Sequence, residues 1–372
     1  MRPRTTFAAL LLVTALLPLM MGCGTASPSK PFPAGQSFVY VGNNGPQTIS
    51  GFKRDISTGA LTEVPGSPFA ASVQAELWSP TFAVDPENQM LFSLGSDAGK
   101  GQLSVFLIDP DTGTLSTASG SPFNCSCIVR SISVAPQGRF VYVAAVDKGI
   151  FAWRIDRAHR TLVPVRGSPF GESTHPYQGA TVDNAGKFLY TAEYTHGIET
   201  FAIDQNTGAL ELVNGPFYIP HNAPLSITMH PSGNYAYIQG DANDLSLKLW
   251  VCAVIPSDGA VSALEQEWGG VPLLALTPDG NFLITSVGLY WTLPSEPYLW
   301  GYSADPLESL LPAAVAVTPD NHFVYATTST AQQSDPGSLS VFLLDETTHS
   351  LTPIPGSPYT VGANPVAIAV TH

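Results

Sequence analysis

Seven strand-like runs of similar composition, repeated along most of the chain, predict an all-β fold built from copies of one small sheet. The runs begin at aromatic or apolar residues that are 41 to 52 residues apart, namely Phe38, Met90, Phe140, Phe188, Tyr235, Phe282 and Phe323. A period near 50 residues is typical of repeat architectures. The 33 Gly and 33 Pro among 372 residues also describe a chain that turns often, so long helices are not expected.

Each repeat shows the same order of strands and turns. In the third repeat an apolar strand at 131–136 meets a Gln137-Gly138 turn, and "RFVYVA" and "GIFAWRID" follow as the second and third strands before a fourth. Turns such as "PDG" at 278–280 combine a fixed φ at Pro with a positive φ at Gly, which reverses a hairpin. Four antiparallel strands per repeat predict the blade of a β-propeller, and seven repeats predict seven blades.

The two ends of the repeat region predict how the ring closes. The C-terminal segment "NPVAIAVTH" matches the first strand of a unit, "AAVAVTP" at 313–319, whereas the first unit, beginning at Ser37, lacks that strand. We therefore expect the C-terminal strand to complete the first blade and remove two free sheet edges. The propeller is predicted to span residues 37–372.

The N-terminus has the layout of a secretion signal. Arg2 and Arg4 precede an apolar run at 7–17, which is too short for a membrane span, and the small Gly22-Cys23 pair follows it. Residues 1–22 are predicted to be a bacterial lipoprotein signal peptide with Cys23 as the lipidated residue, an ordinary cleaved signal being the alternative. Residues 23–36, rich in Pro, Ser and Gly, are expected to be a flexible tether. The predicted location is the cell envelope, facing the periplasm or the exterior.

The motif "GSPF" recurs at 66–69, 120–123 and 167–170, and as "GSPY" at 356–359. A catalytic serine is needed only once, whereas these four serines occupy the same place in their repeats. We therefore interpret the motif as structural, with Gly and Pro bending the chain where it leaves the outer strand and crosses to the next blade.

Charge and cysteine content exclude some classes of function. The net charge of −14 and the 12% of charged residues argue against nucleic-acid binding, which needs clustered Lys and Arg. Membrane contact is expected only through the N-terminal lipid, and we predict a monomer with no cofactor and no metal site. Cys125 and Cys127 are two residues apart, which strains a direct bridge, so their oxidation state stays open; Cys252 is expected to be a buried thiol.

The repeat "FVYVGNNGPQTISGFKRDISTGALTEVPGSPF", which recurs with variation, resembles the YVTN/lactonase-like seven-bladed propeller family, which includes 6-phosphogluconolactonase-type proteins. The resemblance covers almost all of the chain after the tether. It implies the propeller fold and a carboxylic ester hydrolase acting on a lactone. It also implies a His six residues before the Pro that ends an inner strand, but here Pro80, Arg130, Gln178, Leu225, Pro272 and Ala313 hold the equivalent positions. The resemblance further implies a loop motif of the form Asp-x-Gly-x-Asp. In "AAVDKGIFAW" the chain has Asp147 and Gly149 at the first two of these positions, but Phe151 stands at the second Asp position.

The residues that do not repeat are the candidates for a functional site. In this strand order the crossovers and the loops between second and third strands share one face, around the mouth of the central channel. The ligand-binding candidates on that face are Arg130, Asp147, His175, Tyr177, Glu193, His196, His221 and Trp268. For the three histidines a loop residue making one hydrogen bond is the alternative, and no catalytic residue is assigned.

Two functions fit these residues. The first is a lipid-anchored scaffold that binds a small anionic or carbohydrate ligand, or a protein partner, with Arg130 holding an anionic group and aromatic residues stacking on the ligand. The alternative is a lactonase that hydrolyses a sugar lactone or related cyclic acid, with a His or Glu as general base. The sequence leaves open whether the protein is an enzyme.

Overall fold

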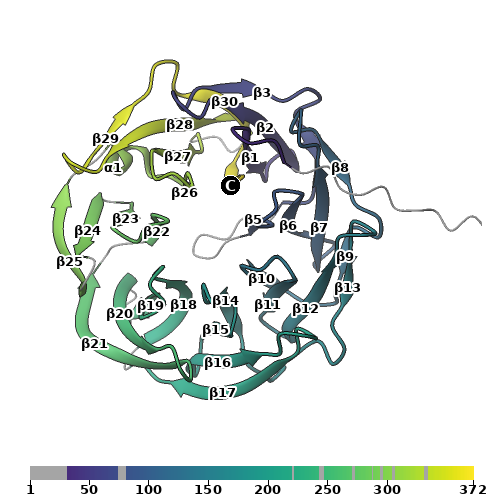
Figure 1. Ribbon diagram of the computed structural model, residues 1–372, viewed down its shortest axis with the longest axis vertical. Helices are drawn as coiled ribbons and strands as arrows, with labels where there is room; N and C mark the ends of the chain where they lie inside the picture. Colours follow the sequence, from purple (N-terminus) through teal and green to yellow (C-terminus); the bar gives the residue numbers. More distant parts are fainter. Residues whose placement is uncertain are drawn as a thin grey trace, which may run out of the picture.

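The computed structural model shows a ring of seven antiparallel sheets arranged around a central axis, with the chain running once around the ring (Figure 1). The predicted all-β seven-bladed propeller is thereby confirmed, including four antiparallel strands in each blade. The structure describes residues 32–73, 81–219, 222–242, 247–269, 273–286, 288–293, 296–303, 306–330 and 334–372. The predicted signal peptide and Cys23 lie outside these residues.

The blades that carry the two chain ends and the site described below are built as follows, from the axis outward. Blade 1 contains β31 (Pro365–Val370), β1 (Ser37–Asn43), β2 (Thr48–Arg54), β3 (Leu61–Glu63) and β4 (Phe69–Ala70). Blade 2 contains β5 (Phe82–Val84), β6 (Met90–Asp97), β7 (Lys100–Ile108), β8 (Leu115–Thr117) and β9 (Phe123–Asn124). Blade 3 contains β10 (Val129–Val134), β11 (Phe140–Ala145), β12 (Gly149–Asp156) and β13 (Thr161–Pro164). Blade 4 contains β14 (Tyr177–Val182), β15 (Phe188–Glu193), β16 (Gly197–Ile203) and β17 (Leu210–Phe217).

The remaining blades repeat this order. Blade 5 contains β18 (Asn222–Met229), β19 (Tyr235–Ala242), β20 (Leu247–Ile255) and β21 (Ala260–Gly269). Blade 6 contains β22 (Leu273–Leu276), β23 (Phe282–Thr285), β24 (Leu289–Leu293) and β25 (Glu296–Ser303), and the short helix α1 (Leu307–Leu310) follows it. Blade 7 contains β26 (Ala314–Val317), β27 (Phe323–Thr328), β28 (Pro336–Asp345), β29 (Ser350–Pro353) and β30 (Tyr359–Ala363). In the part of the chain that the structure describes, no helix combines the length and apolar character that crossing a membrane requires.

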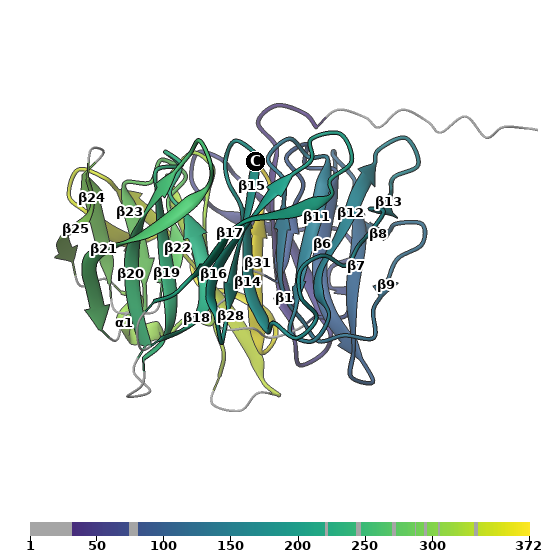
Figure 2. The same cartoon turned by 90° about the horizontal axis from the view of Figure 1, so that it is seen from below.

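The hydrophobic core lies between the blades, because successive side chains of a strand point to opposite faces of its sheet. On β11, Val141 and Val143 pack against blade 2, whereas Tyr142 and Ala144 pack against blade 4. Second strands therefore read as continuous apolar runs, being buried on both faces. Figure 2 shows the blades side by side, with loops at both ends of the ring.

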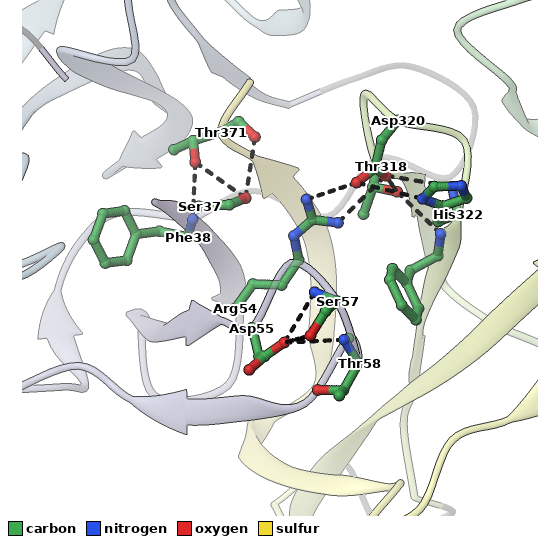
Figure 3. Close-up of polar contacts among 12 residues, drawn as sticks. Ser37, Phe38, Arg54, Asp55, Ser57, Thr58, Thr318, Asp320, His322 and Thr371 are labelled. Atoms are coloured by element: carbon green, nitrogen blue, oxygen red, sulfur yellow. Dashed lines mark hydrogen bonds and ion pairs between the residues drawn. The ribbon is translucent and has the colours of Figure 1, made fainter. Parts of the chain in front are cut away.

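The C-terminal strand closes the ring as predicted. β31 pairs with β1 through Val39↔Val370 and Tyr40↔Ala369. Just beyond the pairing, Thr371 Oγ1 accepts a 2.8 Å hydrogen bond from the Phe38 backbone N–H, and Ser37 Oγ donates to the Thr371 carbonyl at 3.3 Å (Figure 3). Blade 1 therefore joins the last segment of the chain to the first described strand.

Ion pairs join blades across the same end of the sheets. Arg54 of blade 1 contacts Asp320 of blade 7, with Nη2 and Oδ2 3.1 Å apart (Figure 3). Arg157 of blade 3 contacts Asp85 and Glu87 of blade 2, at 2.6 Å and 2.9 Å. In both cases the arginine lies at or just after the end of the third strand of its blade. It contacts an acid in the turn between the first and second strands of the preceding blade, so the two ion pairs occupy equivalent positions.

The serines of the repeated GSPF motif have one shared structural role. Each hydroxyl oxygen accepts a hydrogen bond of 2.8 to 3.1 Å from a backbone N–H of the adjacent third strand, as seen for Ser67, Ser121, Ser168 and Ser357. The chain does not leave the sheet at the motif, contrary to our expectation. In three blades the outermost strand is interrupted at the motif and begins again at the last residue of the motif. These second pieces, β4, β9 and β30, pair with the same third strand as the piece before the motif.

Candidate functional site

The polar residues predicted in the fourth repeat come together at one end of blade 4. Glu193, the last residue of β15, lies opposite Tyr177 at the start of β14 and opposite Gly197 at the start of β16. The turn between β15 and β16 needs glycine at 197, because φ there is +112° and a Cβ would lie 2.1 Å from the Phe217 carbonyl oxygen. This tight hairpin brings His196 back towards Glu193.

Glu193 and His196 form a carboxylate–imidazole pair. Glu193 is fully buried, and its Oε2 lies 2.7 Å from His196 Nδ1. Its other oxygen accepts hydrogen bonds from the Thr195 hydroxyl at 2.8 Å and the Thr195 backbone N–H at 3.1 Å. The His196 side chain is 40% exposed. A buried carboxylate thus fixes one ring nitrogen while the ring itself reaches solvent.

Tyr177, Glu199 and His175 form a second chain of contacts. The Tyr177 hydroxyl donates to Glu199 Oε2 at 2.9 Å, and His175 Nδ1 lies 3.1 Å from Glu199 Oε1 without hydrogen-bond geometry, so the contact is an ion pair when the ring is protonated. Burial, and next the Glu199 charge, raise the pKa of the Tyr177 phenol well above its usual range. Tyr177 therefore acts as a hydrogen-bond donor and not as a base.

The two sets of contacts meet where the imidazole rings stack. The ring centroids of His175 and His196 are 4.4 Å apart, with 30° between the planes. Glu193 and Glu199 are both almost completely buried beneath them. Buried carboxylates are costly unless partnered, so each depends on its hydroxyl and imidazole contacts. The arrangement offers two imidazoles with carboxylates at Nδ1, suited to proton transfer at Nε2.

Two inner strands, β14 and the neighbouring β10, each contain a β-bulge next to this cluster. In blade 4, Tyr177↔Glu193 and Gly179↔Ala192 are paired, which leaves Gln178 as the extra residue of β14. Arg130 is the extra residue at the same place in β10, between Val129↔Ala145 and Ser131↔Ala144. The two inner strands are neighbours, since Ser131 Oγ accepts a hydrogen bond from Ala180 N at 3.2 Å. A bulge re-aims a side chain out of the pleat, and Arg130 is half-buried there.

The other predicted site residues lie elsewhere. Asp147 is exposed in the β11–β12 turn, where its Oδ1 accepts a 2.8 Å hydrogen bond from Ile128 N. Trp268 lies in the outer strand of blade 5 and packs edge-on against Tyr290 of blade 6, with centroids 6.0 Å apart. His221 lies outside the described residues. The structure thus brings together four of the eight candidates, namely His175, Tyr177, Glu193 and His196.

Glu199 is the residue that the sequence interpretation missed. It is the third residue of β16, equivalent to Phe151 in β12, because Glu193↔Gly197 and Ala145↔Gly149 are the same pairing in their blades. "THGIE" at 195–199 therefore has an acid at the second acidic position of the loop motif, which the third repeat lacks. An acid inside an otherwise apolar strand was the available signal. Among the described residues, no three His, Cys, Asp or Glu side chains are placed to hold a metal ion.

Fold and site together define the class of the protein: a seven-bladed β-propeller with a buried acid–imidazole cluster in one blade. Residues 129–229, from the inner strand of blade 3 to that of blade 5, match the family described as "Lactonase, 7-bladed beta-propeller". The fold is thus that of a seven-bladed β-propeller, as the repeats predicted, and over this segment the chain is similar to the lactonase family. The matched segment contains the whole cluster of blade 4.

Similar proteins extend the likeness along the chain. The 6-phosphogluconolactonase of Bacillus subtilis (strain 168) is 23% identical over 373 residues, covering 90% of this chain and 98% of that protein. The crystal structure of a candidate 6-phosphogluconolactonase from Bacteroides fragilis superposes with a TM-score of 0.69 at 17% identity, covering 93% of this chain and all of the other. The periplasmic gluconolactonase of Pseudomonas aeruginosa gives a TM-score of 0.63 at 17% identity, covering 91% and 99%. The structural matches establish the shared fold.

Proposed function

We propose that this protein hydrolyses a sugar lactone at the acid–imidazole cluster of blade 4. The observation that carries the proposal is the pair of stacked imidazoles, His175 and His196, each with a buried glutamate beside Nδ1. The names of the similar proteins support the same class of reaction, since they are gluconolactonases and 6-phosphogluconolactonases. This favours the lactonase alternative over a scaffold that only binds.

His196 is the general base in this proposal. Glu193 at Nδ1 holds the ring in the tautomer that leaves the Nε2 lone pair free. Water gives a proton to Nε2 as its oxygen bonds to the lactone carbonyl carbon. The bond from that carbon to the ring oxygen then breaks, and the ring oxygen takes a proton, so lactone and water become one hydroxy acid.

His175 is placed to stabilise the negative charge that develops during this reaction. With Glu199 beside Nδ1, the ring can present Nε2–H and donate a hydrogen bond to the carbonyl oxygen as that oxygen becomes anionic. Tyr177 is a positioning residue, because its hydroxyl donates to Glu199 and does not itself exchange a proton near neutral pH. Arg130, on the neighbouring inner strand, is proposed to hold the carboxylate of the product.

The test is the hydrolysis of glucono-δ-lactone by the purified protein, followed as acid release and compared with the rate in buffer. His196→Ala should lower kcat about 100- to 10 000-fold, the range for loss of a general base. Arg130→Ala should weaken ligand binding by about 1.5–3 kcal/mol, as expected for a charge-assisted hydrogen bond. His159→Ala is the matched control, since the His159 side chain is exposed in the turn between β12 and β13 and also contacts a carboxylate, that of Asp156.

Hydrolysis no faster than in buffer would overturn the lactonase proposal. The ligand-binding scaffold is then the remaining function. A sugar acid or glycan that raises the melting temperature of the wild type but not of Arg130→Ala would support that function, because a ligand stabilises the folded state by mass action.

We also propose that the protein is exported and anchored by a lipid on Cys23. The proposal rests on Arg2 and Arg4, the apolar run after them, and the Gly22-Cys23 pair that follows it. Cys23→Ser should move the protein from the membrane fraction to the soluble fraction. Unchanged fractionation would contradict the lipid anchor.

A further inference from the structure

The crossover from blade 2 to blade 3 contains a disulfide that the proposed hydrolysis does not use. Cys125 and Cys127 are bridged, although the sequence interpretation regarded a bridge between residues two apart as strained. Cys252, which takes no part in this disulfide, is fully buried in blade 5. In the described part of the chain, one sulfur pair thus lies in a crossover between blades and one thiol lies in the core.

The two sulfurs of this disulfide have different surroundings. Cys125 is half-buried and lines a cavity of about 310 Å³, together with Asp97, Lys100, Gln102, Asn124 and Ser126. Cys127 is 2% exposed and packs in the core between blades 2 and 3. A thiolate that enters the cavity can therefore reach Cys125 Sγ but not Cys127.

The cavity suits a small charged thiol. Lys100 brings a positive charge, which favours the thiolate form of a thiol, and Asp97 beside it can pair with an ammonium group. Gln102, Asn124 and Ser126 add neutral hydrogen-bonding groups. A low-molecular-weight thiol that carries amide, carboxylate and ammonium groups has the matching chemistry.

The disulfide contributes little to holding the fold. A loop closed between residues two apart removes little entropy from the unfolded chain, far less than a long loop does. The backbone on both sides is held without it, because Cys125 N donates to the Gly101 carbonyl at 2.9 Å and Gly101 N donates to the Cys127 carbonyl at 2.8 Å. Opening the bridge therefore leaves the blade intact.

We propose that Cys125–Cys127 is a thiol-exchange site for a low-molecular-weight thiol. The incoming thiolate sulfur bonds to Cys125 Sγ, the Cys125–Cys127 bond breaks, and Cys127 leaves as a thiolate that takes a proton. A second thiolate then attacks the mixed disulfide at the sulfur of the small molecule, which releases a small-molecule disulfide and the Cys125 thiolate. The protein disulfide gains two electrons, and two small thiols lose them.

The site lies directly before Arg130. Ile128 follows Cys127, and its backbone N–H donates a 2.8 Å hydrogen bond to Asp147 Oδ1. Val129 and Arg130 come next, at the start of β10. Cys125 therefore lies in the segment that leads into the bulge carrying Arg130. The exchange proposal is independent of whether the blade 4 cluster hydrolyses lactones.

The experiment is to treat the full-length folded protein with millimolar reduced glutathione, stop the reaction with an alkylating reagent, and map the cysteine peptides. Cys127→Ser, treated with oxidised glutathione, should form a stable glutathione adduct at Cys125. Cys125→Ser is the matched control, and its buried Cys127 should react at least about tenfold more slowly. Lys100→Gln should slow the adduct formation of Cys127→Ser, and circular dichroism should show the same fold throughout.

Three results would overturn the proposal. The first is free thiols at both positions in the native protein after purification in air. The second is equal reactivity of Cys125→Ser and Cys127→Ser towards oxidised glutathione. The third is an exchange rate that follows unfolding across a denaturant series, because the site is proposed to react in the folded state.

Discussion

Blades 1 and 4 bury a polar residue at the same backbone position and use it differently. Asn43 and Glu193 each end a second strand, each lies opposite the first residue of the third strand, and each is fully buried. In blade 1 the Asn43 amide donates to Thr48 Oγ1 at 3.2 Å and to Ser50 Oγ at 3.0 Å, so the contacts stay inside one hairpin. In blade 4 Glu193 holds His196, whose ring reaches solvent.

The difference separates what the fold provides from what the side chain adds. Blades 1, 3 and 4 share a shielded position where the second strand ends, and blade 3 places Ala145 there. A neutral amide bonded to two hydroxyls has no group that titrates near neutral pH, so blade 1 uses the position for structure. A carboxylate beside an imidazole supplies a proton acceptor, so blade 4 can use it for chemistry.

The largest expected effect comes from removing the strand that makes blade 1 complete. Deletion of residues 364–372 removes β31, exposes the β1 edge and opens the ring, while leaving the cluster of blade 4 untouched in sequence. We expect aggregation or loss of cooperative melting, measured by circular dichroism and size-exclusion chromatography. A truncated protein that melts like the wild type would show that blade 1 does not close the ring.

The second test substitutes the equivalent buried residue in each of the two blades. Glu193→Gln keeps the hydrogen-bond acceptor but loses the charge beside His196, so lactone hydrolysis should fall about 100-fold or more with the fold retained. Asn43→Ala should leave kcat unchanged and lower the free energy of unfolding by about 1–3 kcal/mol, because buried hydroxyls lose their partner. Equal effects of the two substitutions on kcat would remove the distinction.

A smaller effect concerns the pH dependence of the seam between blades 7 and 1. Burial raises the pKa of Asp320, but hydrogen bonds from Arg54 and Thr318 and the Arg54 charge outweigh it and hold that pKa below its usual range. The pair therefore stabilises the fold above about pH 3.9, the unfolded value, and this contribution is lost as the pH falls through the folded pKa. Asp320→Asn should cost about 1 kcal/mol at pH 7 and less at pH 3, measured by urea denaturation. Equal cost at both pH values would contradict the pairing.

The smallest effect is expected at a histidine whose pKa is set mainly by burial. His230 in blade 5 contacts Ser232 Oγ at 2.8 Å and the Gly280 carbonyl at 3.3 Å, and burial lowers its pKa. As the pH falls below about 6.5, the unfolded chain takes up the proton first, so stability falls between that value and the lower folded pKa. His230→Gln should flatten this part of the profile of melting temperature against pH. A profile identical to the wild type would show that other groups set it.

The fold could be predicted from the sequence because its signals are local and repeated. Each "FVYV"-type run is apolar on both faces, and each Gly-containing turn has one conformation available, so seven copies agree on one blade. The closure of the ring was predicted because the C-terminal segment resembles the first strand of a unit, which the first unit lacks. The GSPF serines were correctly predicted to be structural, but their exact place was not, because the resumption of the outer strand as β4, β9 and β30 depends on pairing across the sheet.

The candidate site could be predicted only in part. His175, Tyr177, Glu193 and His196 stood out as residues that do not repeat, and the hairpin at Gly197 brings them together. Glu199 was missed because periodicity places it inside a buried strand, where an acid has no expected role. Trp268 stood out by residue type, but the structure places it against Tyr290 of the adjoining blade.

The number of blades, the order of strands within them and the strand that closes the ring follow from the amino-acid sequence, since hydrophobic period and turn residues act over a few positions. Which polar residues share a site depends on how the strands pair. Glu199 and Tyr177 are 22 residues apart along the chain. They meet because β14 and β16 both pair with β15, which places the two residues at the same end of the sheet. The bulge at Arg130 likewise depends on the pairing of β10 with β11. A residue becomes the extra one of a bulge only through the register in which the two strands pair.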